Sequence, residues 1–305
     1  TLTETFGLQF LADERGTQNT YTSQKVTAYI ASFKEVQTVL QKSAGLANES
    51  AHKLEIHELD ESGVNLTLGK TRYRPKLILL AGSLPPEQGQ QLGLPTNWDA
   101  EVLHQYTFTK LKPAKPALSG GNPNPIIPMS LDLGGSLNWA WMLATGSCTQ
   151  LAVESPNLQA SDPVRSLQHW ADVLANQDVL KGVKIDPSAV ISIELPFAGA
   201  LAQDLVANRT LLFGPAGGFY TACGEDIYPC CWSATFAVAA AKAALKEKFL
   251  QDALQQYRQK WGATLGDYLR GPQQNLKFLL PLVYRNATMA ARLAEAILTG
   301  ESVVR

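Results

Sequence analysis

Cysteine and histidine are scarce in this chain of 305 residues, which contains four of each. Neither type recurs at a spacing typical of zinc ligands, such as Cys-x-x-Cys or His-x-x-x-His, so we expect no metal site. Four cysteines in a chain of this length do not indicate a disulfide framework. Free cysteines most often act as small buried hydrophobes, and we therefore expect a protein of a reducing compartment.

Charge is also limited, with 26 basic and 27 acidic residues and a formal net charge of -1. No basic patch stands out, which argues against nucleic-acid binding. The most apolar run, residues 234–241, ends at Lys242 and is too short to span a bilayer, so we expect a cytoplasmic protein. Residues 278–284 (FLLPLVY) are strongly apolar and fit either a buried helix pair or a peripheral membrane contact.

The first third of the chain predicts a helix followed by three strands. Apolar residues recur at helical spacing within residues 26–46. Residues 53–59 and 64–69 alternate in polarity around a turn that contains glycine, which is typical of a hairpin. Residues 76–82 (KLILLAG) form a continuous apolar run, the pattern of a fully buried strand.

The middle of the chain predicts an antiparallel sheet of three or four strands, separated by clusters of Gly, Pro, Asn and Ser. The candidate strands lie within residues 104–113, 125–133, 137–145 and 149–155. Trp139 and Trp141 would share one face of this sheet, either as core residues or against a ligand. A capped helix is expected over residues 161–177, and a strand pair at 189–195 and 210–213. Helices are expected over residues 233–248 and 250–261, and in two pieces over residues 276–298.

A glycine-rich segment joins the last predicted strand to the first of these C-terminal helices. Residues 211–228 read LLFGPAGGFYTACGEDIY, with glycine at four positions between strand and helix. Backbone N–H groups at such a turn attract anions, and glycine allows a close approach. The alternative is a tight strand-to-helix turn that binds nothing.

Residues 214–245 resemble the second flavin-binding motif of FAD-dependent oxidoreductases with the p-hydroxybenzoate-hydroxylase fold. That family has a Gly-Asp-Ala-Ala-Gly-Phe turn, then a Gly-Glu-Gly-Ile segment and a helix of small residues. With one deletion, the matching residues here are Gly214, Ala216, Gly218, Phe219, Gly224, Glu225 and Ile227. Residues 72–94 resemble the family's strand that ends in Gly-Ala-Asp-Gly. Residues 138–143 (NWAWML) resemble an element of the geranylgeranyl-reductase-like branch that lines a hydrophobic substrate cavity.

This resemblance implies a mixed α/β fold, in which an FAD-binding Rossmann-like domain is interleaved with an antiparallel-sheet substrate domain and C-terminal helices. Residues 1–98 would form part of the FAD-binding domain and residues 99–200 the substrate-binding domain. Residues 201–248 would return to the FAD-binding domain, and residues 249–305 would form the C-terminal helices.

The resemblance also implies a function and a set of site residues. The function is that of an FAD-dependent oxidoreductase, reductase or monooxygenase-like, with an external electron donor and a hydrophobic substrate of isoprenoid or aromatic type. The residues expected to bind FAD are Gly214, Ala216, Gly217, Gly218, Gly224, Glu225, Asp226 and Ile227. Trp139 and Trp141 are expected to bind the substrate. No acid or base is assigned, although Tyr220, Cys223 and Asp226 lie near the expected ring position.

Three departures from the family leave other hypotheses open. No Gly-x-Gly-x-x-Gly follows an N-terminal strand, which a segment missing before Thr1 would explain. Pro215 and Gly82 stand where the family has the two aspartates of its motifs. A flavin-free member of the fold that binds an apolar ligand without catalysis is therefore the alternative. A third hypothesis is an interaction module joined to a separate catalytic segment.

Overall fold

The computed structural model describes residues 2–11, 18–45, 54–60, 62–81, 86–94, 103–113, 126–128, 140–145, 147–155, 162–196, 205–219, 227–270 and 286–299. The chain divides into two compact units, each assembled from separate stretches of sequence. The first unit comprises Thr1–Asn48, His104–Leu195 and Gln274–Arg305, and the second comprises Glu49–Leu103 and Pro196–Gln273. Residues 1–48 thus group with the antiparallel sheet, whereas the resemblance groups them with the hairpin. The finer division into four segments stays a prediction.

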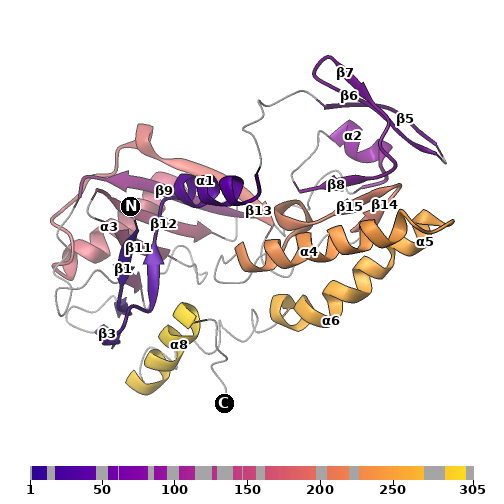
Figure 1. The fold of residues 1–305 in the computed structure, drawn as a ribbon. Coiled ribbons are helices and arrows are strands. Elements are labelled where there is room, and N and C mark those ends of the chain that lie inside the picture. The colour runs from indigo at the N-terminus through magenta and orange to yellow at the C-terminus, as the bar shows by residue number, and fades with distance from the viewer. Residues whose placement is uncertain are drawn as a thin grey trace. The chain divides into compact units, whose positions relative to one another are not determined.

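The first unit is built on a seven-stranded sheet with the strand order β13-β9-β12-β11-β10-β2-β3 (Figure 1). The strands are β2 (Gly7–Leu11), β3 (Gln18–Thr22), β9 (Leu103–Leu111), β10 (Ile126–Pro128), β11 (Ala140–Ala144), β12 (Thr149–Ser155) and β13 (Ile191–Pro196). Strands β9, β12, β11 and β10 form an antiparallel series, and β10 pairs with β2 in parallel. The sheet is larger than expected, because β13 joins it beside β9, and β2 and β3 join it through the pairing of β2 with β10.

Helix α3 (Pro163–Asn176) covers one face of this sheet, and its start follows from its sequence. The Asp162 carboxylate accepts the N–H groups of Val164 and Arg165 at 3.0 and 3.3 Å, and Pro163 stands in the first turn. The apolar stripe predicted for this helix is buried, with Leu167, Trp170 and Leu174 fully inaccessible to solvent. The stripe packs on apolar side chains of the sheet, among them Leu11, Ile126, Met142, Leu151 and Val153.

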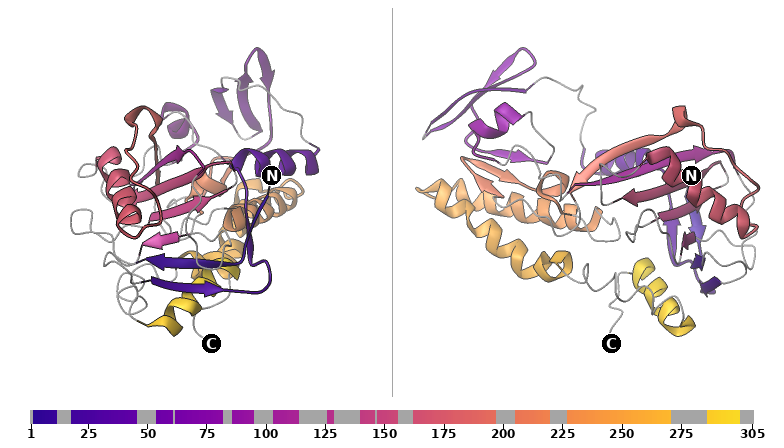
Figure 2. Two further views of the ribbon diagram at one scale, coloured as in Figure 1. Left: turned by 90° about the vertical axis from the view of Figure 1, so that its left-hand side faces the viewer. Right: turned by 180° about the vertical axis from the view of Figure 1, so that it is seen from behind.

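Helix α8 (Ala287–Thr299) packs on the opposite face of the sheet, beside β2 and β3 (Figure 2). Its Ala290, Leu293 and Ala294 lie against Leu8 and Phe10 of β2. Residues alternate between the faces of a strand, which is why Leu11 belongs instead to the α3 core. The start expected for this helical region, residues 276–285, lies outside the described residues.

The N-terminal part of the first unit corrects one prediction. Residues 28–30 lie within the segment of helical periodicity but form strand β4 (Ala28–Ile30), which pairs with β1 (Thr3–Thr5). Helix α1 (Phe33–Ser43) begins only after Ser32. The Ser32 hydroxyl accepts the Glu35 N–H at 3.2 Å, and the Glu35 carboxylate accepts the Ser32 N–H at 3.3 Å. This reciprocal cap sets the start of the helix.

The second unit contains two three-stranded sheets and several helices. One sheet is the predicted hairpin with a third strand: β5 (Leu54–Asp60), β6 (Gly63–Leu68) and β7 (Thr71–Tyr73). The other has the order β14-β15-β8, from β14 (Val206–Ala207), β15 (Thr210–Leu212) and β8 (Ile78–Leu80). The helices are α2 (Pro86–Gln91), α4 (Ile227–Ala244), α5 (Leu250–Leu254) and α6 (Gln256–Arg270). Residues 189–195 and 210–213 therefore do not pair with each other, since β13 and β15 belong to different sheets.

Candidate functional site

The glycine-rich turn follows the carboxyl end of β15, which pairs in parallel with β8. The Phe213 N–H donates to the Leu80 carbonyl at 3.0 Å and extends this pairing by one residue. The chain then forms a short 3-10 helix, η4 (Gly214–Gly217). Ligands of open α/β sheets gather at the carboxyl ends of parallel strands, and the turn stands at such an end.

Two of the glycines adopt a backbone conformation that other residues rarely take. Gly214 has φ +61° and Gly218 has φ +77°, both in the left-handed region. At Gly217 the requirement is space, since an added Cβ would lie 2.7 Å from the ring of Phe219. Contacts or backbone conformation within the protein therefore explain why glycine stands at each of these three positions.

The backbone of the turn is bonded to its surroundings. Three of its N–H groups donate within the protein: Gly214 to Ser233 Oγ at 3.0 Å, Ala216 to the Ala81 carbonyl at 3.3 Å, and Gly218 to the Pro215 carbonyl at 3.0 Å. The Ser233 hydroxyl donates in turn to the Cys230 carbonyl at 2.8 Å, which ties the turn to α4. The turn is therefore a fixed part of the second unit.

Two aromatic residues of α6, Tyr257 and Trp261, contact the strand and the residue that flank the turn. Phe219 is fully buried, and its ring meets that of Trp261 edge to face with centroids 5.6 Å apart. The Tyr257 hydroxyl donates to the carbonyl of Leu212 at 3.1 Å. Burial raises the pKa of Tyr257 above its usual value, with a smaller contribution from Cys230. Tyr257 therefore stays neutral and acts as a hydrogen-bond donor to β15.

Helix α4 starts at Ile227, six residues before the predicted start, and is apolar on all sides. The side that faces the core carries Ser233, Ala237, Ala240, Ala241 and Ala244. The neighbouring row carries aromatic residues in contact: Trp232 stacks on Phe236 at 5.4 Å and meets Tyr228 at 6.4 Å, and Phe236 packs against the core. Ile227 is 47% exposed. The small residues explain how α4 packs closely on β15 and α6.

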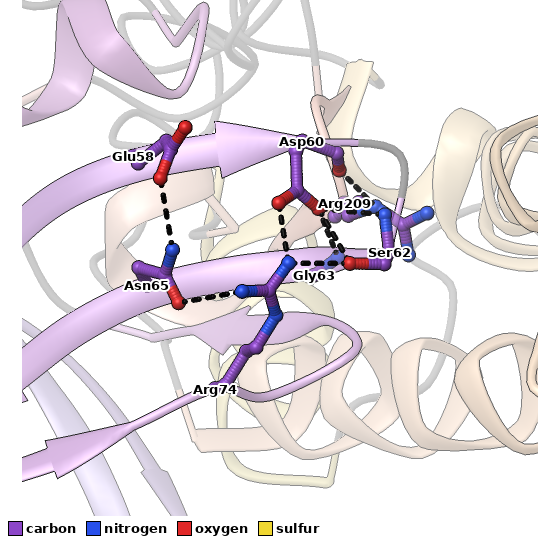
Figure 3. A network of polar contacts seen from close by, with 7 residues as sticks. All are labelled: Glu58, Asp60, Ser62, Gly63, Asn65, Arg74 and Arg209. Carbon is purple, nitrogen blue, oxygen red and sulfur yellow. Dashed lines mark hydrogen bonds and ion pairs between the residues drawn. The ribbon is translucent and has the colours of Figure 1, made fainter.

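A polar network holds the hairpin and the strands beside the turn in place (Figure 3). The Arg209 guanidinium donates to the backbone carbonyls of Asp60 and Lys76, both at 3.0 Å. Asp60 accepts hydrogen bonds from Ser62 and Gly63 and forms an ion pair with Arg74. Hydrogen bonds from Ser62 are the main cause that lowers the pKa of Asp60 to about 2. The network thus joins β5 to the β14–β15 turn within the second unit.

Several predicted site residues lie outside the described residues: Gly82, Trp139, Tyr220, Cys223, Gly224, Glu225 and Asp226. Gly214, Ala216, Gly217 and Gly218 lie together in the turn, and Ile227 begins α4. Trp141 lies on β11 in the other unit, where its half-buried side chain packs beside the Leu8 and Phe10 cluster. The substrate-binding role of Trp141 stays a prediction, as do the cofactor-binding roles of the other residues.

The first unit contains a buried polar cluster that the sequence patterns did not indicate. Glu154 Oε1, on β12, lies 2.5 Å from His104 Nδ1 and accepts the Tyr106 hydroxyl at 3.3 Å, both on β9. Glu154 is only 6% exposed, and its Oε2 is buried without a hydrogen-bond partner within the described part of the chain. The available signal was a carboxylate inside an otherwise uncharged strand, TQLAVES.

Two features are absent from the described residues. These residues contain no group of three or more His, Cys, Asp or Glu side chains that could hold a metal ion. They also contain no helix with the length and apolarity needed to cross a membrane.

Solved structures provide the comparison with known proteins. No family model and no curated protein matches the sequence. The flavin-dependent brominase Bmp2 superposes with a TM-score of 0.67 at 12% identity, over 98% of this chain and 77% of that one. A geranylgeranyl bacteriochlorophyll reductase-like protein from Thermoplasma acidophilum superposes with a TM-score of 0.61 at 12% identity. The superposition covers 98% of this chain and 74% of that one. The chain shares their fold.

A flavoprotein/dehydrogenase from Cytophaga hutchinsonii also matches, with a TM-score of 0.58 at 13% identity, over 98% of this chain and 76% of that one. The mixed α/β fold that the resemblance implies is thereby confirmed. At these identities the likeness shows the fold alone, and the chemistry depends on the residues of this chain.

The backbone of the turn has the strand-turn-helix order that the resemblance predicts for a flavin site. A parallel strand pair ends at a turn of small residues, and a long helix follows. Ala216 is half-buried and Pro215 is exposed, so this side of the turn faces solvent. Pro215 stands where the resemblance places a carboxylate, so the side chains of η4 offer no charged group to a cofactor.

Proposed function

We propose that the protein is an FAD-dependent oxidoreductase that acts on an apolar small molecule of aromatic or isoprenoid type. The observation that carries the proposal is the strand-turn-helix formed by β15, η4 and α4 beside the parallel strand β8. It is supported by the fold shared with proteins described as flavin-dependent or as flavoproteins. When bound, FAD would supply electron transfer to or from the substrate.

The residues of this chain would position the cofactor and the substrate. The turn of Gly214, Ala216, Gly217 and Gly218 would lie against the cofactor, and its internal hydrogen bonds keep it in one conformation. The N-terminus of α4 at Ile227 would stabilise negative charge on a reduced flavin through the helix dipole. Gly224, Glu225 and Asp226 belong to the same proposed cofactor site by sequence. An external electron donor and a cytoplasmic location are part of this proposal.

A second candidate function is a flavin-free protein that binds an apolar ligand. Two observations favour it: the Ala216 and Gly218 N–H groups already donate within the protein, and Pro215 occupies the position of the family's aspartate. A turn whose donors are satisfied can persist without a cofactor.

The deciding experiment is an absorption spectrum of the purified protein after incubation with FAD and desalting. The proposed enzyme retains a flavin spectrum, and its protein fluorescence titrates with FAD to saturation. A protein that leaves the desalting column without flavin contradicts the proposed enzyme and supports the flavin-free alternative.

A variant makes this test sharper. Pro215→Asp restores the carboxylate that the resemblance places on the ribityl chain, and a charge-assisted hydrogen bond should tighten FAD binding about 10- to 100-fold. Pro187→Asp is the matched control, because Pro187 is also an exposed proline in the first turn of a 3-10 helix, η3 (Pro187–Ala189), in the other unit. Equal FAD affinity of Pro215→Asp and the wild type would contradict a cofactor at this turn.

A further inference from the structure

The buried carboxylate of Glu154 has an acceptor atom that the protein does not use. Oε1 takes both hydrogen bonds, from His104 Nδ1 at 2.5 Å and from the Tyr106 hydroxyl at 3.3 Å. A carboxylate oxygen accepts hydrogen bonds, so the contact with His104 is satisfied when Nδ1 carries the proton. Oε2 is left buried and without a donor among the described residues.

Such an atom is costly to bury. A carboxylate oxygen removed from water loses its hydration, and without a donor nothing compensates for that loss. Most buried polar side-chain atoms in native structures have a partner, and an exception calls for an explanation such as a bound molecule. Glu154 is held by two neighbours on β9, so it cannot simply turn toward solvent while it keeps both bonds.

The surroundings of Glu154 on the sheet are mostly apolar. Glu154 stands directly opposite Tyr106, and the next row on the same face joins Trp141, Ala152 and Phe108. This row lies on the face opposite α3, since the neighbouring Val153 packs in the α3 core.

Strand β13 extends the same face. The Ser192 hydroxyl lies 3.1 Å from that of Thr107, which is opposite Val153 and therefore on the α3 side. Ile191 and Ile193 alternate with Ser192 and so lie on the side of Glu154, where they are 52% and 44% exposed. The face thus combines accessible apolar side chains with one buried, unused acceptor.

We propose that this face binds an apolar small molecule with one hydroxyl or N–H group, and that this group donates a hydrogen bond to Glu154 Oε2. The inference rests on the proposed function in that it names the class of its substrate. A ligand whose polar group is a carboxylate is rejected, because it brings a second negative charge to the buried carboxylate. A methyl ether of the same shape is disfavoured, because it offers no donor.

Matched ligands test the proposal directly. We would measure binding of 4-butylphenol, 4-butylanisole and 4-butylbenzoate to the full chain by isothermal titration, without added flavin. The phenol should bind about 10- to 100-fold more tightly than the anisole, the range expected for a hydrogen bond to a charged group. The benzoate should bind most weakly of the three.

The variant Glu154→Gln should change which ligand is preferred. Its amide oxygen can keep the bonds from His104 and Tyr106, and its NH₂ group then replaces Oε2 and becomes a donor. The anisole, which accepts a hydrogen bond, should then bind at least as well as the phenol. Glu194→Gln is the control, since Glu194 is an exposed carboxylate on β13, and it should leave the wild-type order unchanged.

Three results with the wild-type protein would overturn the proposal: no binding of any of the three ligands, equal binding of the phenol and the anisole, or a preference for the anisole. This comparison does not depend on the folding of a variant. An unchanged preference in Glu154→Gln, with native circular dichroism, also overturns it. A protein that prefers the phenol but retains no flavin leaves this site standing and overturns only the proposed enzyme.

Discussion

Helices α1 and α3 have the same sequence character but different places in the first unit. Both are amphipathic and both begin at a side-chain cap, Ser32 in α1 and Asp162 in α3. Helix α3 buries its apolar stripe on the sheet, whereas α1 buries no residue. Periodicity therefore predicts that a segment is helical, but it does not predict whether the apolar side of the helix finds a partner.

The exposed side of α1 shows the difference most clearly. Phe33 is 71% exposed, Val39 63% and Leu40 50%. In α3, by contrast, Trp170 is fully buried, and its ring N–H donates to the Trp141 carbonyl at 3.1 Å. Helix α1 is thus held mainly by local interactions and α3 mainly by tertiary packing, which predicts different responses to mutation.

The largest effect is expected for Trp170→Ala in α3. Loss of a fully buried indole leaves a cavity and removes a hydrogen bond to β11, so the free energy of unfolding should fall by about 3–5 kcal/mol. Urea unfolding followed by circular dichroism measures it. Trp170→Phe, which keeps most of the volume but loses the ring N–H, should lie between this variant and the wild type. A loss below about 1 kcal/mol for Trp170→Ala would contradict the packing described here.

A smaller effect is expected at the two caps. Asp162→Ala removes the acceptor for two N–H groups of α3 and should lower the free energy of unfolding by about 1 kcal/mol. Ser32→Ala breaks the corresponding cap of α1, but it should act locally, because no residue of α1 is buried. Hydrogen exchange of the α1 amides should accelerate while the urea midpoint barely moves. Equal shifts of the midpoint in both variants would argue that α1 is as integral to the fold as α3.

The smallest effect is expected for Phe33→Ala in α1. Its side chain is mostly exposed, so truncation should change the free energy of unfolding by no more than about 0.5 kcal/mol. The measurement is the same urea titration, with Leu167→Ala of the buried α3 stripe as the contrasting variant. A loss above about 1.5 kcal/mol for Phe33→Ala would mean that α1 packs on a partner in solution.

Local patterns predicted most of the fold that depends on neighbours in sequence. The hairpin of β5 and β6, the buried strand β8 and helix α3 follow from alternation, an apolar run and a capped stripe. The patterns did not reveal strands β2 and β3 in the large sheet, or the separation of β13 from β15. These features depend on pairing between segments far apart in the chain, which short-range polarity does not encode.

Part of the candidate site could likewise be predicted from the sequence, and part could not. The glycines at 214, 217 and 218 are recognisable as a turn, and their resemblance to a flavin motif indicates the fold. The contacts show why each is glycine: a left-handed backbone at two positions and the ring of Phe219 at the third. The Glu154 cluster has no motif, because His104 and Glu154 meet only through the register of β9 and β12.

The sequence by itself determined the local elements, the caps and the glycine-rich turn, because these depend on backbone preferences and on residues a few positions apart. Only the tertiary structure decided which apolar faces are buried, which strands share a sheet, and where Glu154 lies with one oxygen unused. Those outcomes depend on long-range packing, in which the same helical pattern is buried in α3 and left exposed in α1.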